Sequence, residues 1–364
     1  MKKKIIIFMP SIEGGGVEKN LFLVTNYLSN KISKITLITI SKKFKNKFNK
    51  SIEFKTLNLD LWDRLSRRLK YFLALLLLMK EFFLDKNRLV FSFQANIYCI
   101  ILCKLFGVKI IVRSNSAPIG WSQNSFKKMI FRIFLNKADQ VMVNSLEFKK
   151  ALKKEFKINA KCIYNPLNKT EIIQKSKFKS KKYFKSKNKL RILNIGRFTE
   201  QKDQLTFLKA LNLIKDKIEY EAIIVGRGKL KTELENFIYK NNLKKKIKIV
   251  NFLENPYPII KETDIFILTS KYEGLPNVLL ESLSLNKFVI SSDCQTGPKE
   301  ILLFGKGGLL FQVGDFKELS ERILFFIKNR NLCNQKLKFA KHELKRFDYF
   351  SNLDKYFNLI KKNF

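Results

Sequence analysis

The sequence predicts an α/β protein built from two Rossmann-like domains, each with a parallel sheet. Short apolar runs alternate with longer stretches of helical periodicity, which is typical of a doubly wound parallel sheet. The chain has 364 residues, more than a single hydrophobic core usually organises. A lysine-rich stretch divides the alternating pattern into two series. We therefore expect ligands at the carboxyl ends of the strands, facing a cleft between two domains.

The first series predicts an N-terminal domain over residues 1–170. Its start, MKKKIIIFMP, is basic, but only Ile5–Met9 runs apolar before Pro10, so we interpret it as a strand and not as an export signal. The other strand-like runs of this domain are Ile35–Ile40, Leu89–Phe93, Lys109–Val112, Gln140–Val143 and Cys162–Tyr164.

Residues 171–189 are predicted to be an exposed linker, because Lys175–Lys189 contains eight lysines and no acid. Residues 190–346 then repeat the alternation and predict a C-terminal domain. Its strand-like runs are Arg191–Ile195, Glu221–Val225, Lys246–Val250, Ile265–Leu268, Phe288–Ser291 and Leu309–Phe311. Residues 347–364 have apolar side chains at helical spacing and predict a last helix that packs back on the N-terminal domain.

The composition is strongly basic, with 72 Lys and Arg against 31 Asp and Glu, a net charge of +41. Such a field draws a protein toward nucleic acid, anionic lipid or phosphorylated substrates. Lysines interspersed with Asn, Ile and Phe are also expected from an AT-rich coding sequence, so the charge has a compositional alternative. We find no RNP-like or zinc-finger pattern and expect no nucleic-acid partner. Five cysteines without closely spaced pairs of ligand type fit a reducing cytosol.

The stretch Arg64–Leu84 combines basic and apolar residues. Its longest apolar run, Tyr71–Met79, is shorter than the ~20 residues of a membrane-spanning helix. Two interpretations stay open: a helix that lies on an anionic membrane surface, and a core helix with a solvated basic end. The cations that precede the run are Arg64, Arg67, Arg68 and Lys70.

Glycines and cations follow several of the predicted strands. Gly14-Gly15-Gly16 comes before a helical pattern and could leave free N–H groups for an anion, although a tight turn also needs glycine. Arg197 and Lys202 follow a strand of the second series, where two cations can hold a diphosphate; surface cations are the alternative. Gly226 and Gly228 form a further turn whose N–H groups could face the ligand.

The stretch SKYEGLPNVLLESLSLNK places Glu273 and Glu281 around a turn, with seven residues between them. Pro276 suits the first turn of a helix that carries Glu281, which leaves Glu273 in the loop. The loop carboxylate can reach a reacting sugar, and the helical one can accept hydrogen bonds from ribose hydroxyls. The amides of Gly274, Leu275, Asn277 and Val278 offer a positive helix end to a phosphate.

These motifs together resemble the retaining glycosyltransferases of family 4, which have the two-domain GT-B fold. The resemblance runs over nearly the whole chain, through the glycine triplet, Gly196-Arg197 with Lys202, the E-x7-E motif and SSDCQTGPKEI from Ser291 to Ile301. It implies that Arg197 and Lys202 bind the donor diphosphate, Glu281 the ribose and Glu273 the transferred sugar. It places Gly15 and Gly16 against the phosphate or sugar, and Gly297 and Glu300 near the donor.

The resemblance also implies the chemistry: an acceptor hydroxyl attacks the anomeric carbon with retention, and the departing diphosphate takes the proton. No cofactor or metal is implied, and the nucleotide sugar is the donor substrate. UDP-hexose or UDP-N-acetylhexosamine is expected first and GDP-mannose second. The acceptor is expected to be a lipid-linked saccharide at the cytoplasmic face of a membrane, as in O-antigen, capsule or glycan assembly.

Two departures from the family pattern and three other classes complete the hypotheses. Where many relatives carry a histidine, IVRSNSAP offers Arg113, Ser114 and Asn115, and we predict that Arg113 or Asn115 contacts acceptor or sugar. Arg227 stands where relatives usually show an acid. A sugar-nucleotide epimerase would be expected to supply general bases and lacks the glutamate pair. A nucleic-acid-binding protein explains the charge but not the motifs, and a non-catalytic binding subunit would have to lack residues that are present.

Overall fold

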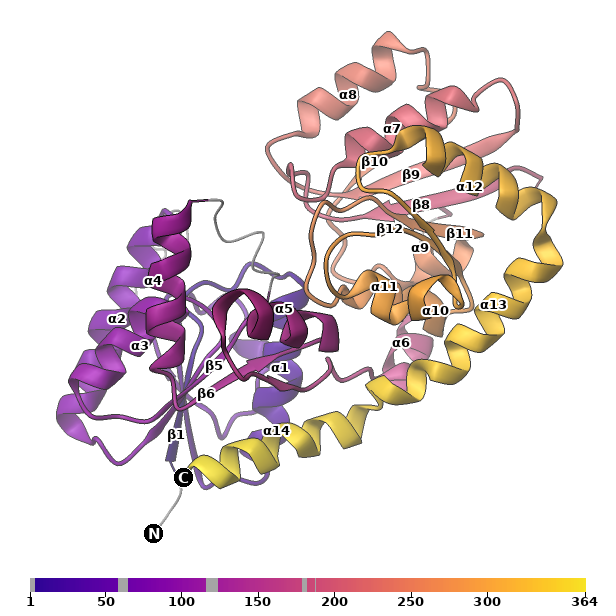
Figure 1. Ribbon diagram of the computed structural model, residues 1–364. Coiled ribbons are helices and arrows are strands. Elements are labelled where there is room, and N and C mark those ends of the chain that lie inside the picture. The colour runs from indigo at the N-terminus through magenta and orange to yellow at the C-terminus, as the bar shows by residue number, and fades with distance from the viewer. Residues whose placement is uncertain (1–3, 58–64, 116–123, 179–181, 187) are drawn as a thin grey trace. The chain divides into compact units, whose positions relative to one another are not determined.

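The computed structural model describes residues 4–57, 65–115, 124–178, 182–186 and 188–364 (Figure 1). The chain divides into two compact units, one of Met1–Pro166 with Tyr349–Phe364 and one of Leu167–Asp348. Each unit holds one parallel sheet with helices on both faces. Among the described residues, none of the helices combines the length and the apolar character that crossing a membrane requires.

The first unit is built on a seven-stranded sheet of order β3-β2-β1-β4-β5-β6-β7, in which neighbouring strands are parallel. Its strands are β1 (Lys4–Phe8), β2 (Lys34–Ile38), β3 (Glu53–Lys55), β4 (Leu89–Ser92), β5 (Ile110–Arg113), β6 (Gln140–Val143) and β7 (Lys161–Cys162). Its helices are α1 (Gly16–Ser29), α2 (Arg67–Leu84), α3 (Asn96–Leu105), α4 (Ser125–Asn136), α5 (Leu146–Phe156) and α14 (Tyr349–Asn363).

Successive residues of each strand face opposite sides of this sheet. In β1, Ile5 and Ile7 belong to the apolar cluster of α1 and α14, whereas Ile6 and Phe8 belong to that of α2 to α5. Both faces are therefore covered, which explains why the strands read as continuous apolar runs. The short strand β3 was not predicted, because Phe54 is its one apolar residue.

The second unit repeats this plan with a six-stranded parallel sheet of order β10-β9-β8-β11-β12-β13. Its strands are β8 (Leu190–Ile195), β9 (Tyr220–Gly226), β10 (Ile247–Asn251), β11 (Ile265–Leu268), β12 (Phe288–Ser292) and β13 (Leu309–Phe311). Its helices are α6 (Lys169–Lys175), α7 (Gln204–Leu213), α8 (Lys231–Lys240), α9 (Tyr257–Glu262), α10 (Asn277–Ser284), α11 (Pro298–Ile301), α12 (Phe316–Lys328) and α13 (Arg330–Glu343). The prediction of two Rossmann-like halves is confirmed, and each predicted strand overlaps an observed one.

The lysine-rich segment packs on the second unit in its described residues, and the chain divides earlier, after Pro166. The Glu221 carboxylate accepts hydrogen bonds from the backbone N–H groups of Lys185 and Ser186 at 2.7 and 3.1 Å, and Phe184 is buried. The structure therefore differs from the exposed linker predicted over residues 171–189, because an acid and a buried ring hold this backbone in place.

The last helix, α14, lies beside α1 on the first unit, far from it in sequence (Figure 1). Leu353, Tyr356 and Ile360 are buried in the apolar cluster that α14 shares with α1. At the helix surface, Lys31 forms an ion pair with Asp354 at 3.0 Å. The first unit is thus completed by residues from the end of the chain.

Candidate active site

The candidate site lies at the carboxyl-terminal edge of the second sheet. The strands of this sheet are parallel, so the loops that follow β8, β9, β11 and β12 meet at one edge. Strand β8 has β9 on one side and β11 on the other, the reversal of strand order at which open α/β sheets bind ligands. The predicted residues at this edge, on the strand ends, the loops and the helices that follow them, are Gly196, Arg197, Lys202, Gly226, Gly228, Glu273, Gly274, Leu275, Asn277, Val278, Glu281, Gly297 and Glu300.

The centre of the site is an ion pair between Lys202, after β8, and Glu273, after β11. Glu273 is 7% exposed, and its carboxylate also accepts a hydrogen bond from the Ser270 hydroxyl at 2.6 Å. Its backbone carbonyl accepts another from the Thr296 hydroxyl at 2.6 Å. The carboxylate is therefore fixed in position, with a cation from another loop beside it.

Further hydrogen bonds tie the loops after β8 and β11 together. The Gln201 side-chain amide donates to the Tyr272 carbonyl at 2.9 Å, and the Lys271 N–H donates to the Gln201 carbonyl at 2.8 Å. The Thr269 hydroxyl donates to the Lys202 carbonyl at 2.9 Å. Sequence reasoning missed these supporting residues, of which Gln201 and Tyr272 stand directly beside the predicted Lys202 and Glu273.

Arg197 is exposed on the loop after β8, unlike the paired Lys202. Its backbone carbonyl accepts from the Gln204 side chain at 3.1 Å, which fixes the start of the loop. Within the described ranges, no hydrogen-bond or ion-pair partner occupies the Arg197 guanidinium. A guanidinium in this state presents five donors to an anion in a planar fork.

Two glycines let the loops approach closely enough to form this edge. A Cβ atom on Gly226 would lie 1.9 Å from the Gly196 carbonyl oxygen, and one on Gly297 would lie 1.8 Å from the Gly274 carbonyl oxygen. Gly297 also has a φ of +58°, which side chains rarely tolerate. Both positions therefore require glycine, because any side chain would clash with the backbone of the neighbouring loop.

Helix α10 begins at Asn277, so Pro276 precedes the helix and does not occupy its first turn as predicted. Glu281 is buried on the second turn, at 6% exposure. Glu300 is buried on α11, which follows Gly297. The two glutamates of the E-x7-E motif thus come from a loop and a helix, as predicted, and both are held in buried positions.

Cys294 is a further buried group close to the Glu273 carboxylate. Burial raises the pKa of the Cys294 thiol to about 12, and the negative charge of Glu273 adds to this shift. The thiol is therefore protonated at neutral pH and is no nucleophile. In the described part of the chain, no group of three or more His, Cys, Asp and Glu side chains is placed to hold a metal ion.

The predicted anion site of the first unit lies at the N-terminus of α1, which begins at Gly16. There the Glu18 carboxylate accepts hydrogen bonds from the N–H groups of Gly15 and Glu13 at 3.0 and 3.3 Å. An internal carboxylate thus takes up amides that we had expected to face a phosphate.

Arg113 is fully buried at the end of β5. Its guanidinium donates to the Tyr356 hydroxyl at 3.0 Å, to Asn165 at 2.7 Å and to Asn115. Asn115 in turn donates to the Phe93 carbonyl at 2.8 Å. The structure therefore gives Arg113 the role of joining α14 to the sheet, in place of the predicted contact with acceptor or sugar.

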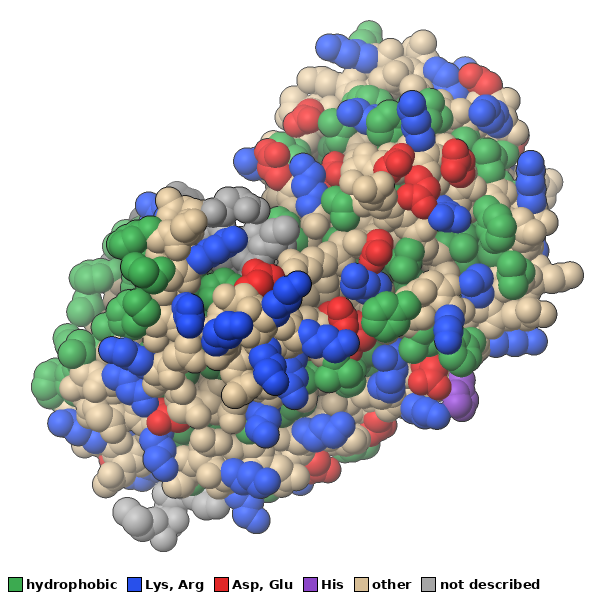
Figure 2. Space-filling view, in the orientation of Figure 1, with side chains coloured by type: hydrophobic (Ala, Val, Ile, Leu, Met, Phe, Trp, Pro, Cys, Tyr) green, Lys and Arg blue, Asp and Glu red, His purple; other side chains and the backbone are tan. Residues whose placement is uncertain are grey.

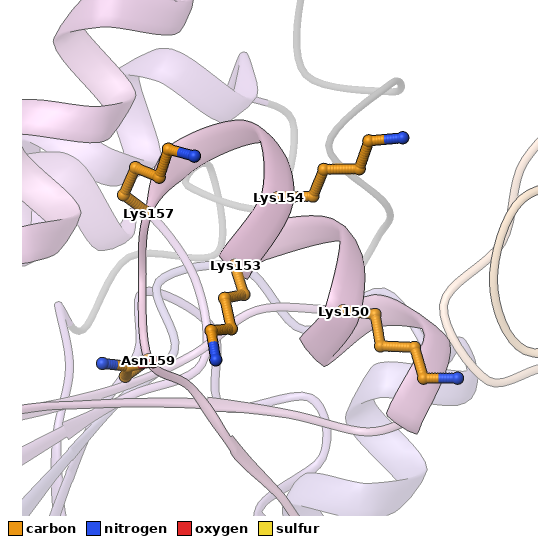
Figure 3. Close-up of a pocket in the computed structure, with 5 residues that line it drawn as sticks. All are labelled: Lys150, Lys153, Lys154, Lys157 and Asn159. Carbon is orange, nitrogen blue, oxygen red and sulfur yellow. The ribbon is translucent and has the colours of Figure 1, made fainter.

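A hollow of about 490 Å³ opens on α5 of the first unit (Figure 3). It is lined by Lys150, Lys153, Lys154, Lys157 and Asn159, and none of the predicted site residues lines it. The lysine side chains point in different directions, and Lys150 pairs with Glu147 at 3.0 Å. We interpret this hollow as part of a solvated basic face.

Comparisons with known proteins agree with this geometry. Residues 175–343 match the family model of the glycosyl transferases group 1. The chain is 26% identical over 360 residues to N-acetylgalactosamine-N,N'-diacetylbacillosaminyl-diphospho-undecaprenol 4-alpha-N-acetylgalactosaminyltransferase of Campylobacter jejuni, covering 95% of this chain and 96% of that one. It is 33% identical over 217 residues to an uncharacterized glycosyltransferase of Methanocaldococcus jannaschii, covering 56% of this chain and 53% of that one.

Two solved structures share the fold over nearly the whole chain. HepE from Anabaena, solved in complex with UDP, superposes with a TM-score of 0.78 at 17% identity and covers 99% of this chain and 100% of that one. Sucrose-phosphate synthase from Thermosynechococcus elongatus superposes with a TM-score of 0.81 at 14% identity, and the match covers 99% of this chain and 98% of that one. The chain therefore has the GT-B fold, and residues 175–343, within its second unit, are similar to the glycosyl transferases group 1.

Proposed function

We propose that the protein is a retaining glycosyltransferase of family 4, which moves a sugar from a nucleotide diphosphate sugar to a hydroxyl of a saccharide acceptor. The observation that carries this proposal is the exposed Arg197 guanidinium on the same loop as Lys202, whose ammonium pairs with the buried Glu273. A fork of donors and a nearby ammonium suit a diphosphate, and they stabilise the negative charge that grows as it leaves.

In the reaction, the bond between the anomeric carbon and the diphosphate oxygen breaks, and the acceptor oxygen bonds to the same face of the sugar. The acceptor proton passes to the departing diphosphate, so the protein needs neither a strong base nor a metal. Glu273, held by Ser270 and Thr296, contacts the transferred sugar, while Glu281 binds the ribose. Lys202 is then shared between Glu273 and the diphosphate.

The relatives support a particular donor and acceptor. Two Campylobacter jejuni relatives, matched over 95% and 98% of this chain, are named as N-acetylgalactosaminyltransferases acting on saccharides linked to undecaprenol diphosphate. HepE was solved with UDP. We propose a UDP-N-acetylhexosamine or UDP-hexose donor and a lipid-linked acceptor at the cytoplasmic face of a membrane, in cell-surface polysaccharide assembly. GDP-mannose is the second candidate donor.

A panel of nucleotide sugars tests the proposed function. The protein is incubated with UDP-GlcNAc, UDP-GalNAc, UDP-glucose, UDP-galactose and GDP-mannose, each with and without EDTA. Release of nucleoside diphosphate and protection against thermal unfolding are measured. We expect at least one donor to be hydrolysed slowly and to raise Tm, since a ligand at 100 times its Kd stabilises the folded state by about 2.7 kcal/mol.

EDTA should change neither result. A panel in which no donor protects the protein or is hydrolysed contradicts the proposed function, and a strict metal requirement contradicts its mechanism.

A further inference from the structure

The outer faces of α2, α3 and α4 carry rows of exposed apolar side chains. On α2, Leu69, Phe72, Leu76 and Phe83 recur at helical spacing, and Phe72 and Phe83 are 57% and 72% exposed. The inner face of the same helix buries Ala74, Leu78 and Phe82 in the core of the first unit. The outer row is therefore not needed to fill that core.

The two neighbouring helices continue this surface. Phe126, Met129 and Ile133 are exposed along α4, and Tyr98 and Leu105 are exposed on α3. Helix α3 packs against both α2 and α4, so the three rows are adjacent. Figure 2 shows hydrophobic side chains gathered over these helices at the left edge of the view. Contiguous exposed apolar surface of this kind marks an interaction site in soluble proteins.

The charge of these three helices is almost entirely positive. Their one acid, Glu81, is buried and paired with Arg88 at 2.6 Å. Their basic residues are Arg67, Arg68, Lys70, Lys80, Lys104, Lys127, Lys128 and Arg132. Among them Lys80, Lys127 and Arg132 are exposed on the same helices as the apolar rows. The surface thus combines insertable apolar side chains with cations.

We propose that the outer faces of α2, α3 and α4 form a docking surface for an anionic lipid bilayer, which the protein binds without spanning it. Aromatic and aliphatic side chains partition into the interface between headgroups and acyl chains, and Lys and Arg on the same helices attract anionic headgroups. The absence of any exposed acid on these helices, in their described residues, matches the uniform negative charge of such a membrane.

The structure also changes which cations we assign to this proposed surface. The sequence pointed to Arg64, Arg67, Arg68 and Lys70, but Arg67 pairs with Glu13 at 2.7 Å and Lys70 is buried. Arg64 lies outside the described residues. The core-helix interpretation of this stretch is supported, because α2 buries one face in the core of the first unit. The exposed apolar face of α2 is compatible with the membrane interpretation, which stays a proposal. The contribution of α3 and α4 was not visible in the sequence.

Co-sedimentation with vesicles tests this proposal independently of any transferase activity. Vesicles of 30% phosphatidylglycerol in phosphatidylcholine are compared with pure phosphatidylcholine, at low and high salt. An apolar variant (Phe72→Gln, Met129→Gln, Ile133→Gln) and a charge variant (Lys80→Gln, Lys127→Gln, Arg132→Gln) are compared with wild type. Each variant has a matched control with three substitutions at exposed positions of the second unit. The control for the apolar variant carries Tyr239→Gln, Leu332→Gln and Phe339→Gln. The control for the charge variant carries Lys240→Gln, Lys338→Gln and Lys341→Gln.

We expect wild type to bind the anionic vesicles at least tenfold more strongly than the neutral ones, and the affinity to fall at high salt. The affinity of each test variant for the anionic vesicles should be at least fivefold lower than that of wild type, while the affinity of each control should stay within twofold of wild type. All substituted residues are exposed, so folding is retained, and unchanged circular dichroism checks this. Equal binding to both vesicle types, or equal loss in test and control variants, overturns the proposal. The proposal is also overturned if wild type forms a dimer in the absence of vesicles and the apolar variant does not, because a second copy of the chain would then cover this surface.

Discussion

At the scale of single residues, the site depends on a carboxylate that the fold has removed from water. Burying Glu273 is costly unless the charge is paired and hydrogen-bonded, and the protein supplies both through Lys202 and Ser270. The same contacts hold the oxygen atoms in place before a ligand arrives. A preorganised charge of this kind acts most strongly on charge that develops during a reaction.

Substitutions of the two glutamates of the E-x7-E motif should affect different kinetic parameters. Glu273→Gln should lower kcat, by about 10²-fold, because its proposed partner is the reacting sugar and such a contact matters most in the transition state. Glu281→Gln should chiefly raise the KM for the donor, because ribose contacts are made equally in ground and transition states. Initial rates at varied donor concentration measure both, with the exposed Glu233→Gln as control. The opposite pattern would exchange the two roles.

Several residue contacts could not be predicted from the sequence, because they join distant segments. Lys202 and Glu273 were predicted individually, but their direct pairing depends on β8 and β11 being neighbours in the sheet. Arg113 was predicted to contact acceptor or sugar because it stands in the stretch where many relatives carry a histidine. Its partners Asn165 and Tyr356 come from a later loop and from the last helix, and only the folded chain brings them together.

At the scale of secondary-structure elements, the C-terminal end of α2 is fixed to the sheet by charge. Asp85 forms an ion pair with Lys4 of β1 at 2.7 Å and accepts from the Asn87 N–H at 2.9 Å. These hydrogen bonds, that of Lys4 foremost, lower the pKa of Asp85 from 3.8 to about 2. The folded state therefore holds this carboxylate ionised at pH values where the unfolded chain protonates it.

A lowered pKa predicts a definite dependence of stability on pH. The contribution of Asp85 is present above pH 3.8 and is lost as the pH falls toward about 2, because the unfolded state then binds the proton first. Asp85→Asn should therefore reduce the free energy of unfolding at pH 6 and flatten its decline between about pH 4 and 2. Urea titrations at each pH measure this, with the exposed Asp216→Asn as control. If the free energy of unfolding of Asp85→Asn declined between about pH 4 and 2 as steeply as that of wild type, the lowered pKa of Asp85 would not explain the decline.

Elements were predictable from the sequence where burial dominates. The strands of both units were identified because a parallel sheet covered on two faces requires continuous apolar runs. Strand β3 and the packing of the lysine-rich segment were not identified. The acids that hold this segment, Glu221 and Glu262, lie 36 and 79 residues from the backbone groups that they bind. Local charge alone indicated an exposed linker there.

At the scale of the whole molecule, part of the net charge of +41 lies beside the two proposed binding surfaces. The second unit presents cations at the carboxyl edge of its sheet, where the proposed donor diphosphate binds. The first unit presents cations beside exposed apolar rows, where we propose a membrane. A lipid-linked acceptor is consistent with both proposals, although each rests on its own observations and is tested separately.

The central claim is that Arg197 binds the diphosphate of the donor, and calorimetric titration tests it most directly. Wild type, Arg197→Ala and the control Lys338→Ala are titrated with the nucleoside diphosphate selected in the donor panel and with its parent nucleoside. We predict that Arg197→Ala lowers the affinity for the nucleoside diphosphate at least tenfold, about 1.4 kcal/mol, and keeps the affinity for the nucleoside within twofold of wild type. Equal diphosphate affinity in wild type and Arg197→Ala, or an equal loss for both ligands, would contradict the claim.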